Sequence, residues 1–126
     1  MTVVLDASAL LAVMHAEPGH EQVLEEWEDA VIGAVNRSEV VSKLVDYGMS
    51  APEAISLLND LGLDVEDFDT SLADAAATLR SATRGKGLSL GDRACLALAA
   101  REGASILTAD RAWGGLDIDL DIRLIR

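Results

Sequence analysis

The chain has 126 residues, half of them hydrophobic and a quarter charged, which is enough for one globular domain with its own core and unlike a disordered chain. Aromatic residues make up 3% and the single cysteine is Cys95, which excludes an aromatic platform for stacking nucleic-acid bases, an internal disulfide framework and a cysteine-based zinc site. Ten basic residues face 22 acidic ones, for a net charge of −12, and this balance favours divalent cations or a basic partner over long-range attraction of nucleic acid.

No segment is a candidate for membrane crossing or export. The sequence has no run of about 18 apolar residues. Its first six residues contain no basic residue and end on Asp6, unlike a signal peptide. We therefore expect a cytoplasmic protein without a membrane partner, built as a single domain over residues 1–126.

The N-terminal half alternates short β-type runs with helical patterns. Residues 2–5 are rich in valine, which favours a buried strand, and Pro18 is placed for the first turn of a helix. Asn36 is a candidate N-cap, and Ser50 to Glu53 form a capping box. We predict strands over 2–5 and 30–35, and helices over 7–14, 18–29, 36–47 and 50–61.

The C-terminal half continues the same rhythm. Asp69 is a candidate N-cap, and Ser89 and Asp92 stand at capping-box spacing. Gly103 is placed to end the helix that follows. We predict strands over 63–68, 105–108 and 121–125, helices over 70–83 and 93–101, and a basic, glycine-containing loop over 84–90.

Alternating strands and helices predict an α/β fold. A central, mostly parallel sheet of four to five strands would be flanked by helices on both faces. Asp117, Asp119 and Asp121 alternate with Leu and Ile, which predicts the wet face of an edge strand. Ligands of such sheets bind outside the carboxyl ends of the strands, so residues that follow strands are the first candidates for a site.

Four acidic residues have positions that would bring them to that edge. Asp6 follows the first strand, and Glu39 lies in the first turn of the helix after the second. Asp92 stands at the start of a later helix, and Asp110 follows the strand over 105–108. Asp92 can equally be a simple helix cap, and Asp110 a turn residue, so convergence is an expectation for the structure to test.

Asp6 is the hardest of the four to explain as a surface residue. It interrupts two apolar segments and must be substantially buried, and a buried carboxylate needs a partner. No Lys or Arg is near it in sequence, which makes a cation a candidate, and a set of carboxylates suits Mg²⁺ or Mn²⁺. The hydroxyls of Ser8 and Thr108 could orient the acids, or could serve only as a cap and as strand-end packing.

Four short motifs, taken in order, resemble those of PIN domains, and the single-domain form resembles VapC toxins of toxin–antitoxin pairs. The motifs are Leu5-Asp-Ala-Ser8, Ser38-Glu-Val40, Leu90-Gly-Asp-Arg-Ala-Cys-Leu-Ala97 and Leu107-Thr-Ala-Asp-Arg-Ala-Trp113.

The resemblance implies a PIN-like fold and a Mg²⁺- or Mn²⁺-dependent endoribonuclease. Asp6, Glu39, Asp92 and Asp110 would be its catalytic acids. Asp6, Asp92 and Asp110 would ligate the metal, and Glu39 would act through water. The resemblance also implies a homodimer inhibited by a cognate VapB-type antitoxin, in a heterotetramer or a larger complex.

Basic residues near the last two motifs are candidates for holding the RNA backbone. They are Arg84, Lys86, Arg93 and Arg111. For Arg84 and Lys86, which belong to the glycine-containing loop, simple solvation of that loop explains the positions equally well. The acidity of the chain also predicts an antitoxin that presents Arg or Lys to the acidic pocket.

Two other functions remain open from the sequence. One is a non-catalytic PIN-like partner of an antitoxin within a DNA-binding autoregulatory complex, and the other is a PIN nuclease outside toxin systems. Neither a G-x-G-x-x-G fingerprint nor a P-loop is present. Cys95 and Trp113 are expected to be core residues, and His15 and His20 are not spaced as a zinc pair.

Overall fold

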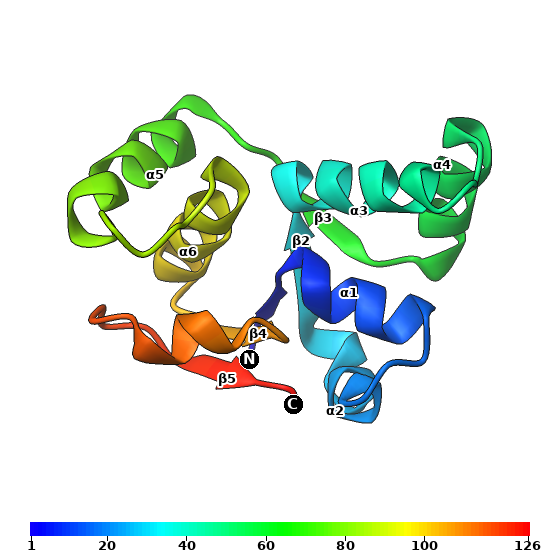
Figure 1. The fold of residues 1–126 in the computed structure, drawn as a ribbon, viewed down its shortest axis with the longest axis horizontal. Coiled ribbons are helices and arrows are strands. Elements are labelled where there is room, and N and C mark those ends of the chain that lie inside the picture. The colour runs from blue at the N-terminus through cyan, green and yellow to red at the C-terminus, as the bar shows by residue number, and fades with distance from the viewer.

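The computed structural model describes all 126 residues as a five-stranded sheet with helices on both sides (Figure 1). The strands follow the order β3-β2-β1-β4-β5, and all four neighbouring pairs are parallel. The α/β prediction is confirmed.

The strands are β1 Val3–Leu5, β2 Ala30–Gly33, β3 Asp64–Glu66, β4 Ser105–Thr108 and β5 Ile122–Leu124. The helices are α1 Ala7–Met14, α2 His20–Glu25, α3 Ala34–Asp46, α4 Ala51–Leu61, α5 Thr70–Ala82 and α6 Leu90–Glu102, with the short 3-10 turns η1 Trp27–Asp29 and η2 Arg111–Gly115.

Two helical layers cover the sheet because its strand residues alternate between the faces. Val4, Val31 and Ile106 pack with α5 and α6 in one apolar cluster. Leu5 and Leu107 face the other way and pack with residues of α1 and α2. Ile32 joins that opposite face in a third cluster, with residues of α1, α3 and α4. Figure 1 shows α5 and α6 on one side of the strands and α1 to α4 on the other.

The topology brings the ends of β1 and β4 together. The chain builds outward from β1 through β2 to β3 and then returns to the other side of β1 with β4 and β5. Leu5 is in register with both Ile32 and Leu107, so Asp6 emerges beside the end of β4. The strand order reverses between β1 and β4, and the carboxyl edge at this switch point is where ligands bind in open parallel sheets.

The segment predicted as one helix over 18–29 is instead a short helix, α2, followed by the 3-10 turn η1. Gly19 precedes α2 with a φ of 95°, and a Cβ there would lie 2.2 Å from the carbonyl oxygen of Ile125. The chain therefore turns sharply at Gly19 to let the C-terminal segment pass, and the helix cannot begin at Pro18.

Three other local predictions were wrong. Asn36 does not cap a helix, because α3 begins two residues earlier with Gly33 as N-cap. Helix α6 begins at Leu90, directly after its cap Ser89. Residues 117–121 are not a strand, because β5 covers only Ile122–Leu124.

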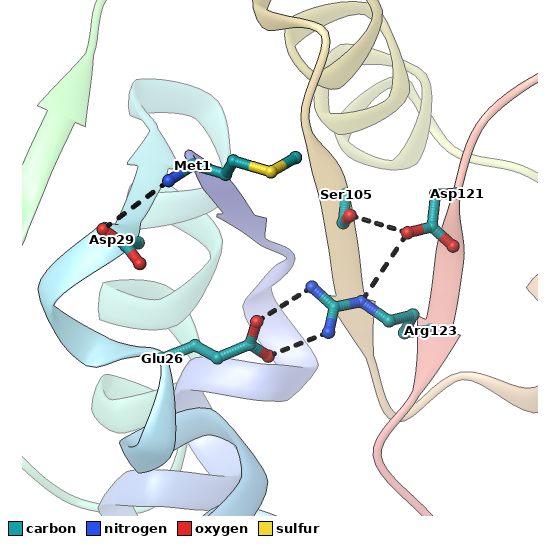
Figure 2. Close-up of polar contacts among 6 residues, drawn as sticks. All are labelled: Met1, Glu26, Asp29, Ser105, Asp121 and Arg123. Atoms are coloured by element: carbon teal, nitrogen blue, oxygen red, sulfur yellow. Dashed lines mark hydrogen bonds and ion pairs between the residues drawn. The ribbon is translucent and has the colours of Figure 1, made fainter.

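An ion pair joins the edge strand β5 to the end of α2 (Figure 2). The guanidinium of Arg123 donates through Nη2 and Nη1 to the two carboxylate oxygens of Glu26, at 2.9 and 3.1 Å. Asp121 lies 3.8 Å from Arg123 Nε and accepts a hydrogen bond from Ser105. This network joins the end of α2 to the last two strands. No helix of the structure is both long and apolar enough to span a bilayer.

Candidate active site

A cavity of about 210 Å³ opens at the carboxyl edge of the sheet, and all four predicted acids line it. Each acid comes from a different place in the fold: the end of β1, the first half of α3, the first turn of α6 and the start of η2. The complete lining is Asp6, Ala7, Ser8, Leu11, Asn36, Glu39, Lys43, Asp92 and Asp110. Residues separated by more than 100 positions therefore share one pocket.

Asp6 is held rigidly at the base of this cavity. It caps α1, with Oδ1 accepting hydrogen bonds from the Ala9 amide at 3.0 Å and from the Ser8 hydroxyl at 2.7 Å. Its Oδ2 accepts one from the Thr108 hydroxyl, also at 2.7 Å. Oδ2 keeps an acceptor position free, because each carboxylate oxygen can accept about two such bonds. Asp6 is therefore oriented but not saturated.

The two hydroxyls that hold Asp6 are themselves fixed by the backbone after β4. Ser8 Oγ accepts from the Ala109 amide at 2.9 Å, and Thr108 Oγ1 accepts from the Asp110 amide at 3.0 Å. Each hydroxyl thus donates to Asp6 and accepts from a backbone N–H group, which fixes the direction of its proton. Ser8 and Thr108 connect the segment after β1 to the segment that carries Asp110.

Burial makes Asp6 an unusually weak acid. Its exposed fraction is 6%, and desolvation raises its pKa to about 6, although the hydrogen bonds from Ser8, Thr108 and Ala9 oppose the shift. The charge of Asp92 raises it further. Burial also raises the pKa of Glu39, and the charge of Asp92 raises it further. The hydrogen bond from Asn36 and the charge of Lys43 act in the opposite direction. The charge of Asp92 therefore acts on both Asp6 and Glu39.

Asp92 and Asp110 each use one carboxylate oxygen in a local cap. Asp92 Oδ2 accepts from the Ser89 amide at 3.0 Å within the capping box of α6. Asp110 Oδ1 accepts from the Ala112 amide at 3.0 Å. As the side chains stand, no three acidic, histidine or cysteine residues are close enough together to surround a metal ion. Ligation of an ion would therefore require these two side chains to turn into the cavity.

The donor set nevertheless fits a hard divalent cation. Four carboxylates and one ammonium line the cavity, so the ionised groups carry an excess of negative charge that only protons or cations can balance. Carboxylate oxygens are the preferred ligands of Mg²⁺ and Mn²⁺. Asp6 is buried without a Lys or Arg partner in hydrogen-bond contact, and it keeps a free position on Oδ2 for an ion.

Cys95 lies fully buried in the core near these acids. Burial raises the pKa of its thiol well above the usual range, and the charges of Asp6, Asp92 and Glu39 add to that effect. The thiol therefore stays protonated near neutral pH and is a poor nucleophile. Its predicted role as a core residue is confirmed, as is that of Trp113, which is 1% exposed.

None of the four predicted RNA-binding residues lines the acidic cavity. Arg84 lies in the α5–α6 connection beside a separate cavity of about 290 Å³ that Arg80 also lines, and Lys86 is exposed in the same connection. Arg111 is exposed at the start of η2. Arg93 is directed at α5 instead, where its Nη1 donates to the Ala76 carbonyl at 3.2 Å.

Two polar residues that line the cavity were not predicted as site residues. Asn36 was interpreted as a helix cap, but it is buried and donates to Glu39 at 2.7 Å. Lys43 is the one basic residue of the lining. Lys43 stands four residues after Glu39, one turn along the same helix face, and this spacing could have identified it.

Comparison with known proteins gives a consistent family and fold. The family model described as PIN domain matches residues 3–118. Among curated proteins, no sequence matches this chain significantly.

Several solved structures superpose on nearly the whole chain. The DNA-bound VapBC structure from Salmonella typhimurium matches with a TM-score of 0.78 and 19% identity, covering 100% of this chain and 99% of that one. FitAcB from Neisseria gonorrhoeae matches at 0.73 and 18%, with 98% of each chain covered. VapC20 from Mycobacterium tuberculosis, described as a sarcin-ricin loop cleaving toxin, matches at 0.72 and 15%, covering 95% and 99%. At these identities the likeness establishes a shared fold.

Proposed function

Because this chain belongs to the PIN domain family, we propose that it is a divalent-metal-dependent endoribonuclease and the toxin of a toxin–antitoxin pair. The observation that carries the proposal is the single cavity in which Asp6, Glu39, Asp92 and Asp110 meet at the switch point of the sheet. Only Ala7 and Leu11 of the lining are apolar, and the ligand that the four carboxylates favour is a cation with the phosphate that the cation attracts.

Asp6, Asp92 and Asp110 are the residues we assign to hold Mg²⁺ or Mn²⁺. When bound, the cation supplies activation of a water molecule and stabilisation of the charge that builds on the phosphate. Asp6 presents its free Oδ2 position, while Ser8 and Thr108 hold the carboxylate in place. The caps that Asp92 and Asp110 make use only one oxygen each, so a turn of each side chain would present its second oxygen to the ion.

Glu39 and Lys43 have the complementary roles. Asn36 engages Oε1 of Glu39, which leaves Oε2 to accept a proton from the attacking water. The raised pKa of Glu39 makes it a better base than an ordinary surface carboxylate. We assign Lys43 to contact the RNA phosphate, since it is the one basic residue of the lining. Attack by water, without use of the 2′-hydroxyl, leaves 5′-phosphate and 3′-hydroxyl ends.

The partner we propose is a basic VapB-type antitoxin. Structures that share this fold include the VapBC complex from Salmonella typhimurium noted above. The net charge of −12 favours a partner segment that presents Arg or Lys to the acidic cavity. An antitoxin fragment without basic residues that still inhibited fully would contradict this part of the proposal.

Cleavage of RNA by the purified chain tests the catalytic proposal. We expect cleavage that requires Mg²⁺ or Mn²⁺, stops with EDTA and falls about 100-fold or more in Asp6→Asn, as on loss of a group that stabilises transition-state charge. Asp60→Asn is the matched control, because Asp60 is exposed on α4 and lies outside the cavity.

Three outcomes would redirect the assignment. Wild-type protein that binds an antitoxin but cuts no RNA with any divalent ion would favour the non-catalytic partner of a DNA-binding complex. Equal cleavage of single-stranded DNA would favour a nuclease outside toxin systems. Products that end in cyclic phosphates would contradict water as the nucleophile.

A further inference from the structure

The side-chain amide of Asn36 bridges two helices at the wall of the acidic cavity. Asn36 is 2% exposed. Its Nδ2 donates to Glu39 Oε1 at 2.7 Å and to the backbone carbonyl of Gly91 at 3.1 Å. Glu39 belongs to α3 and Gly91 to the first turn of α6, so both protons of one amide tie the Glu39 carboxylate to the start of another helix.

The orientation of this amide is fixed at a cost. Asn36 Oδ1 is buried and has no hydrogen-bond partner. Turning the amide over would place Oδ1 against a carboxylate oxygen and a carbonyl oxygen, which are both acceptors. Since buried carbonyls are nearly always paired in folded proteins, the unpaired Oδ1 shows that the two donor contacts of Nδ2 dominate this position.

Gly91 supplies the other half of the arrangement. It occupies the second position of α6, where alanine would be the better helix former. A Cβ added there would lie 2.3 Å from Glu39 Oε2, 2.5 Å from Cδ and 2.6 Å from Oε1. The Glu39 carboxylate thus packs directly on the Gly91 backbone, and any side chain at residue 91 would displace it.

We propose that Asn36 and Gly91 form a clamp that fixes the Glu39 carboxylate beside Asp92 and thereby sets the affinity of the acidic cavity for its divalent cation. Asp92 follows Gly91 directly, so the clamp fixes the positions of the α3 and α6 acids relative to each other. Asn36 and Gly91 are positioning residues in this scheme, because they act through Glu39. The scheme rests on the metal-dependent function proposed above.

Two measurements on the purified chain test whether the clamp sets the metal affinity. The first is the rise in melting temperature that Mn²⁺ causes, and the second is the Mg²⁺ concentration that gives half-maximal RNA cleavage. We expect Asn36→Ala and Gly91→Ala each to weaken Mn²⁺ binding about tenfold, the usual effect of removing a group that orients a metal-site ligand. In a Glu39→Ala background, each should add less than twofold. Asn59→Ala and Gly115→Ala are the matched controls, because Asn59 lies outside the cavity and a Cβ at Gly115 would meet nothing.

Metal-free melting temperatures test the clamp without any nuclease activity. Gly91→Ala should destabilise the wild-type background, where the new Cβ collides with Glu39. It should be neutral or stabilising in Glu39→Ala, where only the better helix propensity of alanine remains. An equal shift in both backgrounds, or wild-type Mn²⁺ affinity in Asn36→Ala, would overturn the clamp. Wild-type protein without any Mn²⁺ response would overturn the metal site itself, and the sign reversal would still show whether Gly91 accommodates Glu39.

Discussion

At the scale of single residues, Asp6 shows how the fold stores unfavourable energy at the cavity. Its carboxylate is desolvated, has no basic partner in hydrogen-bond contact and accepts three hydrogen bonds that only partly compensate. The folded protein therefore prefers the protonated acid until the pH exceeds about 6. A bound cation would relieve this cost, so the same residue connects stability to metal binding.

Asp6→Asn should stabilise the metal-free protein near neutral pH. The folded pKa lies above the unfolded value, so the contribution of Asp6 to stability falls as pH rises from about 4 to about 6 and then stays low. A rise from 3.8 to about 6 corresponds to a cost of about 3 kcal/mol at pH 7.5. Asparagine can keep the contacts with Ser8 and Ala9 through its oxygen and can donate from its amide to the second lone pair of Thr108 Oγ1. In the variant the Thr108 proton can turn to Ser8 Oγ, 3.3 Å away.

Thermal melts at pH 4 and pH 7.5 without divalent ions check this prediction. The variant should melt above wild type at pH 7.5, and the two curves should approach each other at pH 4. Added Mn²⁺ should raise the melting temperature of wild type and leave that of Asp6→Asn nearly unchanged. A variant less stable than wild type at pH 7.5 would show that the Asp6 charge is not a burden to the fold.

At the scale of elements, the sequence predicted what local chemistry determines. The capping box at Ser89 and the side-chain caps at Ser50 and Asp69 mark real helix starts, because their hydrogen bonds close within three residues. The carboxylate of Glu53 accepts from the Ser50 hydroxyl instead of the Ser50 amide, so the predicted box at Ser50 is only half formed. The valine-rich run before Asp6 correctly predicted a buried strand that ends just before this residue. These local signals, together with the parallel topology, were enough to bring the four acids to one edge.

The wrong predictions involve contacts with distant residues. The alternation over 117–121 suggested a strand, but Ile118 and Leu120 pack against the core cluster from an irregular segment, which satisfies the same pattern. Asparagine is a common helix cap, and only the contact of Asn36 with Gly91, 55 residues away, shows that its side chain points into the site instead. Such pairings depend on how helices cross, which a single sequence does not encode locally.

Arg123→Ala should loosen the C-terminal edge of the sheet without changing the acidic cavity. The two-point contact with Glu26 is partly exposed, with exposed fractions of 35% for Arg123 and 27% for Glu26. Its loss should therefore cost about 1 kcal/mol and lower the melting temperature by roughly 3 °C. Arg126→Ala, which loses only a contact to the Pro18 carbonyl, is the control.

Melting curves and limited proteolysis of the C-terminus measure the effect, and Mn²⁺ binding should match that of wild type. Arg123→Lys should restore little stability, because a lysine cannot contact both carboxylate oxygens in the same geometry. Equal loss of stability in both control and test variants would show that Arg123 has no special role in fastening β5.

At the scale of the whole molecule, the basic residues are unevenly distributed, whereas the 22 acidic residues divide equally between the two halves of the chain. The first 63 residues contain only two basic residues, Arg37 and Lys43, while eight follow in the second half. Arg80 and Arg84 line a cavity of about 290 Å³ at the α5–α6 connection, away from the acids. An RNA strand bound by this protein would meet attraction at that connection and repulsion over much of the remaining surface.

Arg84→Ala combined with Lys86→Ala should weaken RNA binding while sparing the chemical step. We expect KM for RNA to rise several-fold with kcat nearly unchanged, because the two side chains lie outside the acidic cavity. The logarithmic dependence of RNA affinity on salt should become shallower by about 1.4, at roughly 0.7 for each lost phosphate contact on a single strand. Arg126→Ala is the control. Unchanged RNA affinity and an unchanged salt dependence in the double variant would show that Arg84 and Lys86 only keep the α5–α6 connection solvated.

The placement of β1 between β2 and β4 has a consequence for biosynthesis. Asp6 is synthesised about a hundred residues before its partner Thr108 and the acid Asp110. A nascent or prematurely terminated chain that lacks β4 cannot assemble the acidic cavity. Under the function proposed above, RNA cleavage can therefore begin only after β4 has been synthesised.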